Sequence, residues 1–154
     1  MNEKIDIGDH MINFERLKNL REDNDISQEK MSTILKVNRS TYSLWELGIN
    51  IIPIKNLIDF CDYFNVNIDY VLSLTNKKTT KFSKPGLDIK KLGENMKNIR
   101  IKNNLSQDYV ATILNVTQPA IARYEKGLVF ISLTNLYKFS KEFNISINYL
   151  CGKE

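Results

Sequence analysis

The chain contains 154 residues, of which 42% are hydrophobic and 26% charged, a balance typical of a folded globular protein. Two cysteines and one histidine are too few for a disulfide framework, a zinc site or a histidine-dependent hydrolase. No apolar run is long enough to cross a membrane, and the first residues lack the pattern of a secretory signal. We therefore expect a cytoplasmic protein with no membrane partner, no cofactor, no small-molecule ligand and no enzymatic activity.

The net charge of +4 is unevenly distributed along the chain. Residues 1–74 carry 8 basic and 12 acidic side chains, whereas residues 75–91 carry 6 basic and 1 acidic. Residues 92–154 carry 8 basic and 5 acidic side chains. The positive charge that would attract a polyanion therefore lies in the middle and the C-terminal part of the chain.

An internal repeat divides the chain. At an offset of 79 residues, Ser27 aligns with Ser106 and Arg21 aligns with Arg100. The aligned identities are mostly apolar or at turns, so the repeat indicates that the same fold is used twice. The expected organisation is a first domain, a basic linker and a second domain, over residues 10–74, 75–91 and 92–152.

In the first domain, the sequence pattern predicts helices that begin after residues marking helix starts. These residues are Ser27, Asn38, Pro53 and Asn67. Two short helices joined by a short turn, over about residues 27–46, match the helix-turn-helix arrangement.

The second domain repeats this plan. Its apolar residues recur at helical spacing and predict five helices, over residues 92–104, 107–115, 118–126, 133–143 and 147–152. The last four of these helices are expected to be capped by Ser106, Thr117, Ser132 and Ser146. Pro119 falls in a first turn, where its missing N–H costs little, and Gly127 follows the end of the same helix. The second helix-turn-helix covers about residues 106–125.

Residues 75–91, TNKKTTKFSKPGLDIKK, are polar and basic and show no helical apolar stripe, which predicts a linker. Its six lysines have two readings. They either follow a phosphate backbone or a minor groove, or they keep a spacer in solution.

The runs S-Q-E-K-M-S-T-I-L-K-V-N-R-S-T-Y-S-L-W-E-L-G and S-Q-D-Y-V-A-T-I-L-N-V-T-Q-P-A-I-A-R-Y-E-K-G resemble the Cro/repressor-like, Xre-type helix-turn-helix family. The resemblance covers nearly all of both domains and leaves out only an N-terminal arm and the linker. It implies an all-α chain of two lambda-repressor-like domains with five helices each. The third helix of such a domain enters the major groove of double-stranded DNA.

The resemblance also implies a set of DNA-contacting residues. In the first domain these are Gln28, Arg39, Ser40, Thr41 and Ser43. In the second domain they are Gln107, Thr117, Gln118, Pro119, Ala120, Arg123 and Lys126. The glutamine that opens the second helix is expected to contact the DNA backbone, and the first residues of the third helix are expected to face base edges.

The second domain is chemically well equipped to read bases. Arg123 can bond guanine O6 and N7, and Gln118 can pair with adenine N6 and N7. Pro119 and Ala120 can contact a thymine methyl group, and Lys126 a phosphate.

The first domain departs from the family pattern. Leu44 and Leu47 stand where many members carry Arg or Lys, and its acidic balance opposes phosphate approach. Because Lys30, Lys36 and Arg39 remain available, DNA binding is expected to be weaker there rather than excluded.

Two further features have structural readings. The spacing of Arg21 to Glu46 recurs between Arg100 and Glu125, and the resemblance implies an internal ion pair in each domain rather than a DNA contact. The apolar residues that follow Gly48 and Gly127 are either core or a dimer surface, so a homodimer is possible.

The leading hypothesis is a sequence-specific transcriptional regulator of double-stranded DNA, with the second domain as its main reader. The alternative is a protein-interaction module of the antitoxin or anti-repressor type, in which the first helix-turn-helix has lost its DNA contacts.

Overall fold

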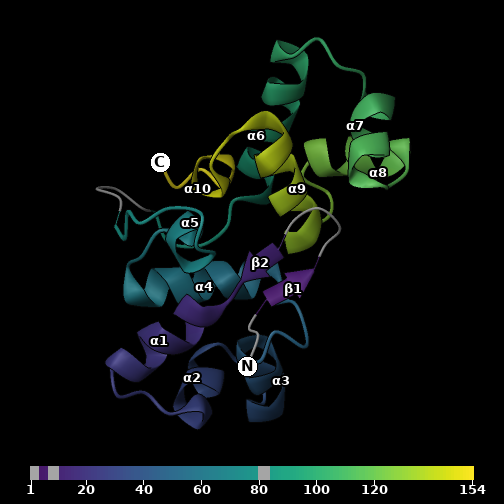
Figure 1. The fold of residues 1–154 in the computed structure, drawn as a ribbon. Coiled ribbons are helices and arrows are strands. Elements are labelled where there is room, and N and C mark those ends of the chain that lie inside the picture. The colour runs from purple at the N-terminus through teal and green to yellow at the C-terminus, as the bar shows by residue number, and fades with distance from the viewer. Residues whose placement is uncertain (1–3, 7–10, 80–83) are drawn as a thin grey trace. The chain divides into compact units, whose positions relative to one another are not determined.

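The computed structural model describes residues 4–6, 11–79 and 84–154. The chain divides into two compact units, Met1–Ser83 and Lys84–Glu154 (Figure 1). The described residues form ten α-helices, five in each unit, and two strands of three residues each. The expected all-α class, with two similar helical domains in tandem, is confirmed. None of the helices in these described ranges is long and apolar enough to cross a membrane.

The first unit consists of a short hairpin followed by five helices. In chain order these are β1 (Lys4–Asp6), β2 (Met11–Asn13), α1 (Glu15–Asp23), α2 (Gln28–Ile34), α3 (Arg39–Glu46), α4 (Ile54–Phe64) and α5 (Ile68–Val71). The strands pair antiparallel, with Ile5 opposite Ile12. The hairpin corrects the expectation of a plain N-terminal arm, because strands this short leave too little alternation for the sequence to reveal them.

The second unit contains five helices in the same order. These are α6 (Ile89–Lys102), α7 (Gln107–Leu114), α8 (Gln118–Glu125), α9 (Leu133–Phe143) and α10 (Ile147–Leu150). All the helix starts predicted from capping or start-marking residues are confirmed, but the Thr117 side chain makes no capping hydrogen bond to α8. Ser27 accepts a hydrogen bond from the N–H of Lys30 at 3.1 Å, and Ser106 accepts one from the N–H of Tyr109 at 3.1 Å.

The first helix of the second unit begins earlier than predicted. The carboxylate of Asp88 accepts a hydrogen bond from the backbone N–H of Lys91 at 3.0 Å and caps α6, which starts at Ile89 rather than at Leu92. Residues 89–91 were expected in the linker and are helical instead. The prediction failed because those residues carry no continuous apolar stripe, although Asp88 is a good cap.

Both described ends of the expected linker are held by hydrogen bonds within their own unit. In the first unit, the Arg16 guanidinium donates to the carbonyl oxygen of Thr75 at 2.6 Å, and the N–H of Asn67 donates to the carbonyl oxygen of Lys78 at 2.7 Å. In the second unit, the ammonium of Lys153 donates to the carbonyl oxygen of Lys84. Thr75, Lys78 and Lys84 are therefore attached to the folded units and do not form a freely solvated spacer.

The cores of the two units use the same positions. Leu57 and Phe60 on α4 are fully buried, and so are their counterparts Leu136 and Phe139 on α9. Each such side chain contributes about 1.5–3 kcal/mol by leaving water. Both helices end at an asparagine in the left-handed conformation. The repeat in the sequence is thus a repeat in the packing, and it places the two helix-turn-helix pairs on equivalent supports.

Candidate nucleic-acid interface

Two helix pairs carry the candidate DNA-contacting residues: α2 with α3, and α7 with α8 (Figure 1). The connecting turns are alike, since Lys36 and Asn115 both adopt a left-handed backbone conformation, with φ of 56° and 52°. The Asn38 side chain accepts from the N–H of Thr41 at 2.8 Å and caps α3. Pro119 lies in the first turn of α8 and removes one N–H that would otherwise need a partner.

An ion pair fixes the third helix of each unit, and it is buried in the first unit and partly buried in the second. In the first unit, Nε of Arg21 lies 2.5 Å from Oε1 of Glu46, and Nη2 donates to Oε2 at 3.0 Å. The pair between Arg100 and Glu125 has the same two distances. The expected internal ion pair is confirmed in both units. Because the fork of the arginine matches both carboxylate oxygens, it sets the angle of the third helix against the first.

The Glu46 carboxylate is held ionised in spite of its burial. Burial opposes the charged form, but the hydrogen bonds from Arg21, the nearby Tyr42 hydroxyl, the hydrogen bond from Gln28 and the positive charge of Arg21 together outweigh it. The pKa of Glu46 therefore lies below its ordinary value.

The glutamines that open the second helices bond to these carboxylates. Nε2 of Gln28 donates to Oε2 of Glu46 at 2.9 Å, and Nε2 of Gln107 donates to Oε2 of Glu125 at 2.8 Å. Both glutamines are half-buried. Each is thus positioned by the ion pair beneath it, and its contact with a DNA backbone stays a prediction.

In the second unit the network extends to the first residue of α8. Nε2 of Gln118 donates to the amide oxygen of Gln107 at 2.8 Å. A chain of hydrogen bonds therefore connects Gln118, through Gln107 and the buried Glu125, to the partly buried guanidinium of Arg100. The first unit has Arg39 at the position of Gln118, and this side chain is exposed.

The outer side of α8 carries the remaining predicted contact residues. The buried residues of the helix are Ile121 and Glu125. Among the predicted residues, Thr117, Pro119, Arg123 and Lys126 are exposed, and Gln118 and Ala120 are half-buried. They lie on one short helix or directly beside its ends, with Gln107 joined to its first residue, and they offer base-reading and phosphate-binding groups within about two and a half turns.

The outer side of α3 is less polar. Arg39 and Ser40 are exposed, whereas Thr41, Ser43, Leu44 and Leu47 are half-buried. The Ser40 hydroxyl donates to the side-chain oxygen of Asn38 at 2.8 Å, so it is committed to the helix cap. Of the predicted residues on α3, Arg39 is the one that brings a positive charge to the surface.

The apolar stretches after the third helices split between core and surface. Ile52 and Ile131 are buried, whereas Ile49 and Leu128 are 66% and 64% exposed. The equivalent positions behave alike in the two units. One part of each stretch therefore belongs to the core, which was one of the two alternatives predicted from the sequence, and the other part is exposed.

The link between Gln107 and Gln118 was missed from the sequence. The only feature of the sequence that points to this hydrogen bond is that two successive helices of the helix-turn-helix both begin with a long polar side chain. A pair of this kind becomes visible only when the turn between the helices is fixed.

Comparison with known proteins gives two family matches. Residues 14–77 match a family described as a helix-turn-helix domain, and residues 96–150 match a second one described as helix-turn-helix. A comparison with curated proteins finds no match.

Two solved structures resemble part of the chain. The restriction-modification controller protein C.AhdI from Aeromonas hydrophila is 25% identical, with 41% of this chain and 96% of that chain covered and a TM-score of 0.39. The hypothetical transcription factor NHTF from Neisseria is 22% identical, with 42% of this chain and 75% of that chain covered and a TM-score of 0.39.

The two matched segments together span most of the chain, and each contains one of the helix pairs described above. They define a DNA-binding regulator of the helix-turn-helix class. The chain carries two helix-turn-helix domains in tandem, which agrees with its resemblance to the Xre-type family.

Proposed function

We propose that the protein is a sequence-specific regulator of transcription that binds double-stranded DNA mainly through α8. The observation that carries this proposal is the hydrogen-bonded chain that ends at Gln118. A side chain that reads a base must be held in one orientation, and here Gln107 holds it. The remaining donor and acceptor groups of the Gln118 amide suit adenine.

Arg123 and Lys126 complete the proposed reader. Arg123 lies one and a half turns after Gln118 and is exposed, so its fork is available to guanine O6 and N7. Lys126 ends the helix and suits a phosphate. Pro119 and Ala120 present small apolar surfaces for a thymine methyl group.

The first unit is proposed to contribute less to reading. Leu44 and Leu47 replace Arg123 and Lys126 at the repeat spacing, and both are half-buried. Arg39 still offers one exposed guanidinium, so its helix supplies some affinity and little discrimination. Either the two units of one chain meet neighbouring half-sites, or two chains pair so that their second units do.

A second candidate role belongs to the first unit alone. Ile49 is 66% exposed and follows the half-buried Leu44 and Leu47. An apolar surface at this position favours a protein partner over a phosphate backbone. In this reading the first unit recruits a protein while the second unit binds DNA.

The test is selection of bound fragments from genomic DNA, followed by titration of the best fragment at two salt concentrations. The chain is compared with Arg123→Ala, Arg39→Ala and the charge-matched control Lys141→Ala. We expect Arg123→Ala to lose about 1–3 kcal/mol of discrimination between fragments. Arg39→Ala is expected to weaken the binding of all fragments alike. It should also reduce by about 1 the slope of the logarithm of the binding constant against the logarithm of the salt concentration.

Equal losses from Arg123→Ala and Arg39→Ala would overturn the assignment of α8 as main reader. If the unaltered chain selects no fragment at low salt, the DNA-binding proposal fails and the protein-interaction role takes its place.

A further inference from the structure

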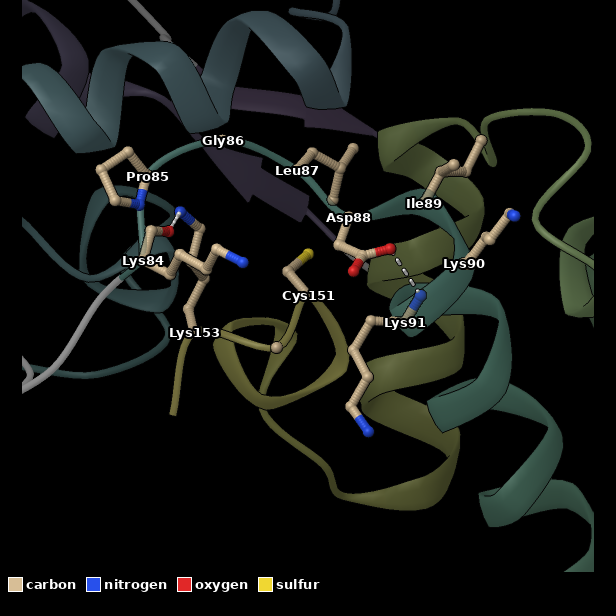
Figure 2. Close-up of a pocket in the computed structure, with 11 residues that line it drawn as sticks. Lys84, Pro85, Gly86, Leu87, Asp88, Ile89, Lys90, Lys91, Cys151 and Lys153 are labelled. Atoms are coloured by element: carbon tan, nitrogen blue, oxygen red, sulfur yellow. Dashed lines mark hydrogen bonds between the residues drawn. The ribbon is translucent and has the colours of Figure 1, made fainter.

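The second unit contains a pocket that the proposed DNA-binding function does not use. Its volume is about 580 Å³, and it lies between the segment that precedes α6 and the end of the chain after α10 (Figure 2). Pockets that bind small molecules have volumes on the order of 300–1,000 Å³. The lining consists of residues 84–91 and 151–153.

The base of the pocket is apolar. Cys151 is buried, and its sulfur faces the backbone around Gly86 and Leu87 (Figure 2). Leu87 and Ile89 are half-buried beside it. A ligand that enters would therefore place a carbon skeleton against this base.

The charged groups of the pocket are mainly ammonium groups. Four lysines and one aspartate line it. The carboxylate of Asp88 is engaged in capping α6, at 3.0 Å from the N–H of Lys91. Lys153 is 3% exposed, which is rare for an ammonium group, and it donates to the carbonyl oxygen of Lys84. Lys84 and Lys91 are exposed, and the Lys91 ammonium lies 3.4 Å from the Glu94 carboxylate in a surface ion pair with which an incoming anion competes. Lys90 is directed away from the Cys151 sulfur (Figure 2). The pocket thus favours a negatively charged ligand.

The first unit provides an internal comparison. At the repeat spacing, the positions of Lys91, Cys151 and Lys153 are occupied in the first unit by Ile12, Leu72 and Leu74. Ile12 and Leu72 are buried and Leu74 is half-buried. The place of Lys153 after the last helix is therefore apolar in the first unit, so this lysine is not required by the fold. Ile12 lies in β2 and Lys91 in α6, so these two residues belong to different elements.

The wall of the pocket touches the C-terminal end of α8. Ile89 and Lys90 form the first turn of α6, and a Cβ atom added to Gly127 would lie 2.8 Å from Cα of Lys90. One turn further along α6, a Cβ atom on Gly93 would lie 2.2 Å from the carbonyl oxygen of Tyr124. These backbones are in direct contact, so a shift of the first turn of α6 reaches the last turn of α8.

We propose that this pocket binds a small organic anion, with its apolar part against Leu87 and Cys151 and its negative group at Lys84 and Lys91. Binding is sensed at Gly127 through the first turn of α6. Neither statement depends on the proposed DNA-binding function.

The test uses the full chain and anilinonaphthalene sulfonate, a fluorescent organic anion with an apolar body. We expect saturable binding with one site per chain. The double substitution Lys84→Glu with Lys91→Glu is expected to weaken binding about tenfold or more. The matched control, Lys97→Glu with Lys102→Glu, makes the same charge change on the exposed side of α6 and is expected to leave binding nearly unchanged. Far-ultraviolet circular dichroism of each variant checks the fold.

A third variant addresses binding of the probe to exposed apolar surface. Leu128→Ser with Phe130→Ser removes the two large apolar side chains exposed after α8, and we expect the pocket to keep its affinity. Equal weakening by both lysine pairs, or loss of binding in this third variant, would overturn the proposal.

Amide chemical shifts test the route to α8. On addition of the probe, the amide of Gly127 is expected to shift, whereas that of Gly48, its counterpart in the first unit, is not. An unchanged Gly127 signal at saturation would overturn the route. A chain that binds the probe but no DNA would refute the proposed function and leave the pocket assignment standing.

Discussion

Gln118 donates a hydrogen bond to Gln107 at 2.8 Å, and this bond joins the first residues of two successive helices. Gln107 in turn donates to Glu125, whose carboxylate is paired with Arg100. The residue proposed to read a base is therefore connected to a buried charge by an unbroken series of side chains. In the first unit, the same series stops at Gln28, because the exposed Arg39 side chain, although rich in N–H donors, makes no hydrogen bond to Gln28 among the described residues.

This relationship predicts different roles for the two glutamines. Gln107→Ala should remove the support of Gln118 and lower discrimination at one A·T position by about 1 kcal/mol, measured by competition with single-base variants of the best fragment. Gln28→Ala is the matched control and should change discrimination little. Equal effects of the two substitutions would show that Gln107 acts only as a phosphate contact.

The Glu46 carboxylate should make the first unit sensitive to acid. Its pKa is lowered on folding from an ordinary value of 4.5, so its contribution to stability is present above that pH. The contribution is lost as the pH falls through the lower pKa of the folded state. Trp45 is the single tryptophan of the chain and is buried in the first unit, so its fluorescence follows this unfolding.

The variant Glu46→Gln should be less stable near neutral pH by about 3 kcal/mol, because the buried Arg21 charge keeps only the more exposed Glu22 carboxylate, 3.4 Å away, as an ionic partner among the described residues. Its stability should also depend less on pH in the acid range. A variant with the same acid response as the unaltered chain would contradict the role given to Glu46.

Tyr42 offers a test in the opposite direction. Its side chain is fully buried, and among the described residues its hydroxyl has no hydrogen-bond partner. Burial, followed by the charge of Glu46, raises the pKa of Tyr42 well above its ordinary range. Because Tyr42→Phe removes an unsatisfied polar group and keeps the ring, it should raise the free energy of unfolding by up to about 1 kcal/mol. Urea unfolding followed by Trp45 fluorescence measures this, and a loss of stability would show that the hydroxyl is bonded.

Gly93 should not tolerate a side chain. A Cβ atom there would lie 2.2 Å from the Tyr124 carbonyl oxygen, so Gly93→Ala must push α6 away from α8 at a cost of about 2 kcal/mol or more. Gly86→Ala is the control, since a Cβ at that position meets nothing within 4 Å. The Gly86→Ala variant should lose only about 1 kcal/mol of stability, because alanine is strained in the left-handed backbone conformation of this position. Circular dichroism should show the loss for Gly93→Ala, while Trp45 fluorescence reports an unchanged first unit.

Local signals in the sequence explain why so much of the fold could be predicted. Ser27, Asn38, Ser106 and Ser132 each act on a backbone group three residues away, so their effect is visible in a short window. The ion pairs were implied by the family resemblance, at residues whose spacing occurs twice in one chain. The hairpin of β1 and β2 was not, since three residues per strand give no measurable alternation.

Features that depend on the meeting of distant segments escaped the sequence. Lys153 reaches Lys84 across 69 positions, and no local pattern connects the two. The pocket between them could not be anticipated for the same reason. The residues predicted to contact DNA come from the resemblance. The structure places them at the starts of α2 and α7 and on or beside α3 and α8, and their contacts with DNA stay predictions.

The ion pair and its glutamine occur in both units with nearly the same distances, while the residues on the outer side of the third helix differ. Support and recognition are therefore carried by separate side chains. A change at position 44 or 123 alters what the surface can bind without touching the group that holds the helix in place. The duplicated chain can thus acquire a new binding preference in one copy while the other continues its original task, and neither copy has to fold differently to do so.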